Sequence, residues 1–261
     1  HDVTLTVTDA SGLTGTCIGV VTVKDTIPPQ AFCNDITVQL DSTGFASIVP
    51  FDVDAGSIDN CQIVFREIEP DSFSCADVGM PIIGTLVVVD QSGNRDSCES
   101  NIMVIDNPPT VMCKDATLCL DSMGMVTVLQ EDIDEAMDDC GIDSVIIEPE
   151  VLTCANVGVN IVTLTVVDVF GASASCQSQV TVEDKIAPTC ETMPIEIFLD
   201  ENGMVSIDSN AVDNGSMDEC GIESIVVDPS TFGCGNVGVN VVVQTVTDLS
   251  GNTSTFSSYV T

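Results

Sequence analysis

Apolar and polar residues alternate with a period of two along most of the chain. Val3, Leu5 and Val7 alternate with threonine, and the segments 125–128 and 204–207 follow a tight glycine turn with the same pattern. This period is typical of β-strands that bury one face. The apolar segments are short, rich in Val, Ile and Thr, and separated by Asp, Asn, Ser and Gly. The pattern therefore predicts an all-β chain without a convincing helical stretch.

These segments recur as a unit of roughly eighty residues. The start of each unit contains proline and is followed by a cysteine, and the end is a strand that leads into an Asp and a glycine turn. Cutting at these points predicts the C-terminal strands of a truncated repeat, two complete repeats and a nearly complete one: 1–25, 26–106, 107–184 and 185–261. We expect the sequence to be a window onto a longer chain of the same repeat.

Each repeat is predicted to fold as an immunoglobulin-like antiparallel β-sandwich, because roughly seven short strands with turns between them fit that architecture. The junctions are short and contain proline, which fixes φ and holds the preceding residue extended. We therefore expect tandem sandwiches joined into a rod.

One order of motifs runs through the repeats: Pro-Pro-x-x-x-Cys, Val-x-Leu-Asp-x-x-Gly, Asp-x-Asp-x-Gly-Ser-x-Asp-x-Cys, Phe-x-Cys-x-x-Val-Gly and Val-x-Asp-x-Ser-Gly-Asn-x-x-x-Cys. This order resembles the hyalin-repeat (HYR-like) immunoglobulin-type modules of very large bacterial surface adhesins and gliding filaments, and the resemblance covers the whole sequence. It implies extracellular tandem sandwiches that serve as a stalk or adhesive fibre, without family-wide catalytic residues. Single repeats depart from the pattern, notably at 132–136 and at Phe256.

The composition narrows the choice of partners. There are 41 Asp and Glu against five Lys and Arg, a formal net charge of −36, although 44% of the residues are hydrophobic. Such a field repels nucleic-acid phosphates and anionic membrane surfaces, and no apolar run reaches the ~20 residues that cross a bilayer. We therefore expect no nucleic-acid partner and no membrane insertion of this segment.

The thirteen cysteines favour disulfides over zinc, since C-x-x-C pairs are absent and His1 is the only histidine. Disulfides in turn indicate an extracellular or cell-surface location. Three pairs recur at a separation of fourteen residues, and we expect each to close a local loop: Cys61/Cys75, Cys140/Cys154 and Cys220/Cys234.

The remaining cysteines allow two schemes. In an immunoglobulin-like sandwich the first and last strands are parallel neighbours, which predicts bonds within the repeats: Cys33–Cys98 and Cys113–Cys176. Because Phe256 replaces the last cysteine of the final repeat, Cys190 should then bond the additional Cys119, and Cys17 should pair upstream. The alternative scheme leaves Cys119 unpaired and joins neighbouring repeats: Cys17–Cys33, Cys98–Cys113 and Cys176–Cys190.

Carboxylates gather before one cysteine of each repeat, namely Cys61, Cys140 and Cys220, and Ca²⁺ takes six to eight oxygen ligands of this kind. The candidate ligands are Asp52, Asp54, Asp59, Asp132, Asp134, Asp138, Asp213 and Asp218. Further carboxylates stand in the last turn of each repeat and at the junctions: Asp9, Asp90, Asp168 and Asp248; Asp25, Asp106 and Asp184. The spacing is not that of an EF-hand loop, so the alternative of solvated loops that keep the chain soluble stays open.

Two sequons, at Asn214 and Asn252, are candidate N-glycosylation sites, although a chain rich in Ser and Thr contains such triplets by chance. No catalytic constellation stands out, because the acids fall on predicted turns and His1 cannot complete a triad within a full repeat. We therefore expect no enzyme.

The function expected is the shaft of an extracellular filament or giant adhesin. Its partners would be neighbouring repeats of the same chain, other copies of the filament, or a surface glycan or protein. Two alternatives are a Ca²⁺-dependent module that binds a carbohydrate or protein, and a fibre subunit that self-assembles by strand exchange.

Overall fold

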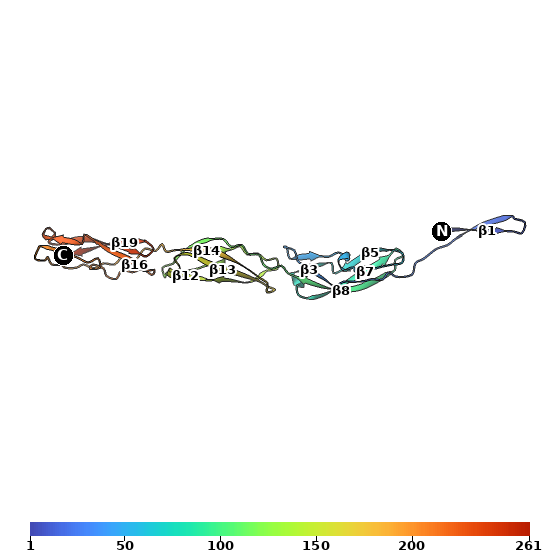
Figure 1. Ribbon diagram of the computed structural model, residues 1–261, viewed down its shortest axis with the longest axis horizontal. Helices are drawn as coiled ribbons and strands as arrows, with labels where there is room; N and C mark the ends of the chain where they lie inside the picture. Colours follow the sequence, from blue (N-terminus) through green and yellow to red (C-terminus); the bar gives the residue numbers. More distant parts are fainter. The chain divides into compact units, whose positions relative to one another are not determined.

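The computed structural model describes all residues, His1–Thr261, and forms two compact units, His1–Asn107 and Pro108–Thr261 (Figure 1). Unit one begins with an antiparallel hairpin of β1 (Asp2–Thr8) and β2 (Thr14–Val20). We name residues 26–107 the first module, 108–184 the second module and 185–261 the third module. None of the helices has the length and hydrophobicity that a membrane-spanning helix needs. The expected division into four parts and the rod stay predictions.

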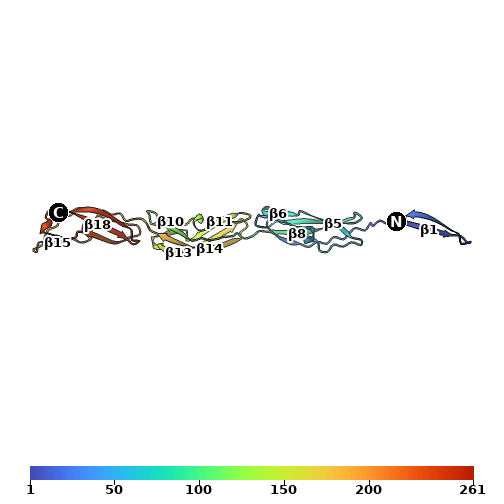
Figure 2. The same cartoon turned by 90° about the horizontal axis from the view of Figure 1, so that it is seen from above.

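The first module contains two sheets. Its elements are β3 (Ile36–Gln39), β4 (Phe45–Ser47), α1 (Pro50–Val53), β5 (Ile63–Glu69), β6 (Ser72–Ser74), the 3-10 turn η1 (Cys75–Asp77), β7 (Pro81–Asp90) and β8 (Arg95–Ile105). The larger sheet has the order β3-β8-β7-β5, with β3 parallel to β8, and the smaller sheet pairs β4 with β6. Strands β6 and β8 accordingly lie in different layers (Figure 2).

The second and third modules repeat this arrangement. The second contains β9 (Ala116–Cys119), β10 (Met125–Thr127), α2 (Gln130–Ile133), β11 (Ile142–Glu148), β12 (Val151–Thr153), η2 (Cys154–Asn156), β13 (Gly158–Asp168) and β14 (Ser173–Glu183). The third contains β15 (Met204–Ser206), β16 (Ile222–Asp228), β17 (Thr231–Gly233), η3 (Cys234–Asn236), β18 (Asn240–Asp248) and β19 (Thr253–Val260). Its larger sheet, β16-β18-β19, has a single parallel bridge from Ile195 to Val260 where the other modules have a strand.

The period of two in the sequence matches the alternation of buried and less buried residues along the strands. In β13, Val162, Leu164 and Val166 are fully buried, while the residues between them face outward or are half-buried. Apolar side chains from both sheets of the second module meet in one cluster, which also receives Ile133 from α2. The core of each module therefore lies between its two sheets.

The strand order identifies the fold. Three antiparallel strands in the order β5-β7-β8, with the first strand of the module added in parallel, form one sheet of an immunoglobulin-like sandwich. The predicted all-β, immunoglobulin-like fold is confirmed. The sequence pattern missed the four-residue helices α1 and α2, which begin after Val49 and Leu129 and are stabilised by a carboxylate in their first turn.

Two disulfides lie within modules, and both join residues expected to bond across the first and last strands. Cys33 bonds Cys98 and Cys113 bonds Cys176, each with a Cα–Cα distance of 5.8 Å. The parallel pairing of β3 with β8, and of β9 with β14, brings these pairs together. The alternative scheme of bonds between neighbouring repeats requires the same cysteines and is therefore wrong.

The predicted loops of fourteen residues are also wrong. Cys61 and Cys234 are free thiols, and Cys154 bonds Cys220 of the following module, with a Cα–Cα distance of 5.1 Å. The reason is the intervening strand: seven residues of β5 carry the chain about 23 Å, and the three residues of β6 return less than half of this. A disulfide needs Cα atoms within about 7 Å. The pairs that fail are Cys61/Cys75, Cys140/Cys154 and Cys220/Cys234.

The predicted bond between Cys119 and Cys190 does not form, and both are free thiols. Thr192 takes the place that Cys33 and Cys113 have in their modules, and Cys190 lies two residues before it, with its side chain facing its own sandwich. There it meets Gln244, whose backbone oxygen lies 3.9 Å from the Cys190 sulfur. Gln244 is fully buried and stands opposite Phe256 in the ladder of β18 with β19. Cys190 is therefore turned away from the preceding module.

Candidate metal centre

Each module has a hairpin turn that is built on an aspartate. Asp90, at the end of β7, accepts the N–H groups of Ser92 and Asn94, both at 2.8 Å, and the side-chain amide of Asn94 at 2.7 Å. Gly93 has φ of 88°, a value that favours glycine. Asp248 is held in the same way by Ser250 and Asn252. The carboxylate is thus fixed at the start of the module.

The asparagine of this turn also holds the linker. The amide of Asn94 donates to the backbone oxygens of Asp25 and Ile27, at 3.3 and 3.4 Å. In the third module the amide of Asn252 donates to the backbone oxygen of Asp184 at 3.1 Å. One residue therefore brings the linker aspartate to the hairpin aspartate.

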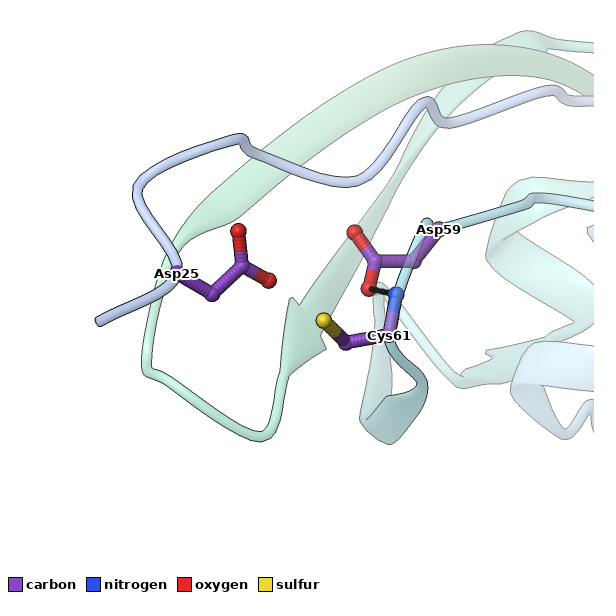
Figure 3. A group of neighbouring side chains, drawn as sticks. All are labelled: Asp25, Asp59 and Cys61. Atoms are coloured by element: carbon purple, nitrogen blue, oxygen red, sulfur yellow. Dashed lines mark hydrogen bonds between the residues drawn. The ribbon is translucent and has the colours of Figure 1, made fainter. Parts of the chain in front are cut away.

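A third carboxylate comes from the turn before β5. Asp59 accepts the N–H groups of Cys61 and Gln62, at 2.8 and 2.9 Å. Figure 3 shows that the side chains of Asp25, Asp59 and Cys61 point toward one another. One ligand atom from each lies within 4.8 Å of the others. We call these residues, with Asp90, the first acidic cluster.

The third module has the corresponding cluster of Asp184, Asp218 and Cys220, whose ligand atoms also lie within 4.8 Å of one another. Asp218 accepts the N–H of Cys220 at 2.8 Å, as Asp59 accepts that of Cys61. In the second module the carboxylates of Asp138 and Asp168 approach within the same distance. The acidic cluster is therefore a repeated feature of the modules.

Like charges perturb these groups. Burial, and then the charges of Asp184 and Asp248, raise the pKa of Asp218, although the N–H of Cys220 opposes this. The pKa of the Cys61 thiol is raised, first by its hydrogen bond to Asp25, then by burial, and then by the charges of Asp25, Asp59 and Asp90. The cluster thus disfavours further negative charge and favours a cation.

The oxygens present fit a hard cation. One oxygen each of Asp25, Asp59, Asp138 and Asp168 is buried without a hydrogen-bond partner. Ca²⁺ binds carboxylates together with backbone carbonyls and water. In the third module the sulfur of Cys220 is held in a disulfide, which leaves oxygen ligands there and disfavours zinc.

Several of the candidate ligands have other partners. Asp52 and Asp132 accept the N–H groups of Val49 and Leu129 and so cap α1 and α2. Asp213 accepts from the buried amide of Gln244 at 2.8 Å and from the hydroxyl of Ser216. These carboxylates stabilise the fold and lie outside the clusters.

Asp54 lies beside Arg66, with 2.6 Å between its Oδ2 and the Nε of Arg66. Burial opposes its ionisation most strongly, but the N–H and hydroxyl of Ser57, Arg66 and the N–H of Gly56 together lower its pKa to about 2. The matching Asp134 is 5% exposed, accepts the N–H of Met112 and has one oxygen without a partner. Of the predicted ligands, the structure brings only Asp59, Asp138 and Asp218 into the clusters.

The linker and hairpin aspartates are visible in the sequence, but their grouping with Asp59, Asp138 and Asp218 was not predicted. The available signal was their recurrence in the same order in every repeat: Asp25, Asp59, Asp90; Asp106, Asp138, Asp168; Asp184, Asp218, Asp248.

Of the two sequons, Asn214 is exposed and stays a candidate glycosylation site. The side chain of Asn252 is engaged with Asp248 and the linker, so a glycan there would disrupt the turn.

No protein-family model matches the chain, and no curated protein matches it in sequence. Among solved structures, an I-band fragment of titin is similar over 91% of this chain and 99% of its own, with 11% identity and a TM-score of 0.39. Drosophila N-cadherin is similar over 99% and 82%, with 14% identity and a TM-score of 0.32. Protocadherin gamma B7 is similar over 96% and 80%, with 13% identity and a TM-score of 0.28. The immunoglobulin-like assignment is based on the strand order within each module.

Proposed function

We propose that the chain is a structural segment of an extracellular filament or adhesin of the hyalin-repeat type, whose modules act as a covalently coupled shaft. The observation that carries this proposal is the disulfide between Cys154 of the second module and Cys220 of the third. Such a bond transmits force from module to module. It also requires an oxidising compartment such as the cell exterior.

The disulfides within modules support the same role. A sandwich of this size, with 4% aromatic residues in the whole chain, gains much of its stability from a cross-link. The negative charge keeps separate copies apart in dilute salt. These properties suit a shaft that spans distance outside the cell.

The test is the state of the cysteines in material from intact cells. Free thiols are alkylated first, disulfides are then reduced and labelled with a second reagent, and peptides are identified by mass spectrometry. We expect Cys154 and Cys220 to carry only the second label, with surface proteolysis of intact cells removing the protein. First-label modification of both cysteines, or protection from external protease, would contradict the proposal.

The acidic clusters favour a second role, a Ca²⁺-dependent module that binds a carbohydrate or a surface protein. The aspartates from the linker, the turn and the hairpin would hold the ion, and its charge would offset their mutual repulsion. Ca²⁺ should bind in the range of ~10⁻⁴–10⁻³ M typical of extracellular modules.

Calorimetry on the full chain tests this role. Asp218→Asn should weaken Ca²⁺ binding to the third module and lower the gain in melting temperature that Ca²⁺ produces. Glu223→Gln removes one charge from an exposed position of β16 and serves as the control. Equal Ca²⁺ titrations for both variants and the wild type, or no heat of binding at millimolar Ca²⁺, would exclude the site.

A further inference from the structure

The hairpin turn of the second module lacks the polar side chains that the other two modules have there. The turn reads Asp-Gln-Ser-Gly-Asn at 90–94 and Asp-Leu-Ser-Gly-Asn at 248–252, but Asp-Val-Phe-Gly-Ala at 168–172. The aspartate that builds the turn is retained, whereas Phe170 and Ala172 replace the serine and the asparagine. The side chains of Phe and Ala donate no hydrogen bond, so the second module keeps the carboxylate but loses its side-chain donors.

This replacement leaves one oxygen of Asp168 without a partner. In the third module, Oδ2 of Asp248 accepts the side-chain amide of Asn252 at 2.9 Å. Asp168 accepts the N–H groups of Phe170 and Ala172 through Oδ1, at 2.8 and 2.9 Å, but its Oδ2 is buried without a hydrogen-bond partner. The whole residue is 1% exposed. A carboxylate oxygen that loses water without gaining a partner destabilises the fold, which points to a ligand at Oδ2.

Asp138 supplies a second oxygen of this kind. Its Oδ1 accepts the N–H groups of Cys140 and Gly141, at 3.0 and 2.7 Å, and its Oδ2 is buried without a partner. One carboxylate oxygen of Asp138 and one of Asp168 lie within 4.8 Å of each other. Two oxygens that each lie about 2.3–2.6 Å from one Ca²⁺ ion are at most about 5 Å apart. The two carboxylates are therefore close enough to bind the same ion.

In the third module the corresponding oxygens are already held. The amide of Asn252 donates to Asp248 and also to the backbone oxygens of Asp184 and Ile186, at 3.1 and 3.3 Å. Oδ2 of Asp184 accepts the hydroxyl of Ser250 at 3.0 Å. The amide nitrogen thus contacts a carboxylate and two backbone carbonyls, which are groups that Ca²⁺ prefers. An ion in this place would have to displace Asn252.

The first module resembles the third at this turn. Asn94 donates to Oδ2 of Asp90 at 2.7 Å. The unpartnered oxygens of this module belong to Asp25 and Asp59, which are half-buried, and the Cys61 thiol lies beside them (Figure 3). Among the three modules, the hairpin carboxylate therefore lacks a side-chain donor in the second.

We propose that Ca²⁺ binds more tightly to the second module than to the others, through Asp138 and Asp168, and that the asparagine at the position of Ala172 competes with the ion in the first and third modules. Backbone oxygens and water would complete the coordination. This inference rests on the proposed Ca²⁺-dependent role and specifies which module binds the ion and which residue decides. The residue four positions after the hairpin aspartate would then distinguish modules that need Ca²⁺ from modules that carry their own donor.

The first test is calorimetric titration of the full chain with Ca²⁺. Ala172→Asn supplies the amide that the other modules have, at an exposed position, and Ser173→Asn places the same amide at the next exposed position as a control. Ala172→Asn should weaken the tightest binding step at least tenfold, whereas Ser173→Asn should leave it unchanged. Equal titrations for the wild type and both variants would overturn the proposal.

A second pair of variants tests the carboxylate itself. Asp138→Asn keeps an oxygen that accepts the N–H groups of the turn but removes the charge, and Asp143→Asn removes a charge from an exposed position of β11. Asp138→Asn should weaken the tightest step at least tenfold and Asp143→Asn less than twofold, with circular dichroism to verify the fold. Equal affinities for these two variants would contradict the assignment.

The third module separates this inference from the role on which it rests. Asp218→Asn should leave the tightest step unchanged, because that step belongs to the second module. If Asp218→Asn removes the tightest step and Ala172→Asn does not, the inference is wrong and the Ca²⁺-dependent role stands. If the wild type gives no heat at millimolar Ca²⁺, both are wrong.

Discussion

The disulfides of the second unit interleave. Cys154 lies within the loop that Cys113–Cys176 closes, and Cys176 lies within the loop that Cys154–Cys220 closes. Under tension, the shortest covalent path from Cys113 to Cys220 crosses both bonds. It follows only the stretch of about 22 residues between Cys154 and Cys176, since an extended chain spans about 3.3–3.6 Å per residue.

Replacing both Cys154 and Cys220 with alanine removes one shortcut. The path then crosses Cys113–Cys176 and follows about 44 residues from Cys176 to position 220, so the fully extended chain lengthens by about 75 Å. Full reduction of the wild type releases all of the roughly 107 residues between positions 113 and 220 and lengthens this segment by about 290 Å. Because these lengths run from position 113 to position 220, the first module lies outside the stretched segment.

Single-molecule pulling with handles attached next to positions 113 and 220 measures these lengths. Under non-reducing conditions the contour length after complete unfolding should differ by about 75 Å between wild type and the double alanine variant. Cys119→Ala, which removes a free thiol, is the control and should leave the contour unchanged. Equal contour lengths for the wild type and the double variant would refute the interleaved connection.

Three further outcomes follow from the modules. Because the pKa of Asp54 is lowered to about 2 from 3.8, its stabilisation of about 2 kcal/mol is complete above roughly pH 4 and is lost as the pH falls through about 2. Arg66→Met should lose part of this stabilisation at neutral pH. Its unfolding, followed by circular dichroism, should depend less on acid pH than that of the wild type, and parallel curves of stability against pH for the two proteins would contradict this. Replacing Cys33 and Cys98 with alanine removes a cross-link over 65 residues and should cost about 4 kcal/mol in urea unfolding, whereas a loss below ~1 kcal/mol would argue against it. Asp134→Asn should change the melting temperature far less than Asp54→Asn, because only Asp54 has an ionic partner, and equal losses would show this reasoning to be wrong.

The fold was predictable because its signals are local. The period of two fixes which side of a strand is buried, as β13 shows. The expected parallel contact of first and last strands was sufficient to pair Cys33 with Cys98. The prediction of a bond between Cys61 and Cys75 was wrong because their constant separation in the sequence was interpreted as closeness in space. Strand β5 lies between them and places them far apart.

The acidic cluster was harder to predict. Its carboxylates come from three segments that lie about thirty residues apart in the sequence, and the group that assembles them is an amide. Asn94 binds the linker at Asp25 and the hairpin at Asp90 through one nitrogen. Composition shows the abundance of acid but not this amide contact. The burial of Gln244 beside Cys190 was equally hidden, because a single polar residue on a strand of alternating pattern normally faces solvent.

The contact sealed by Cys154 and Cys220 joins two unlike surfaces, a glycine hairpin and an acidic turn. It is heterologous, so neither surface is complementary to itself and two copies cannot be related by a two-fold axis through it. A heterologous contact needs only that each module carries one surface of each kind, one to offer to the module before it and one to the module after it. Repeating the module in the gene is therefore sufficient to repeat the contact, without any new surface having to evolve.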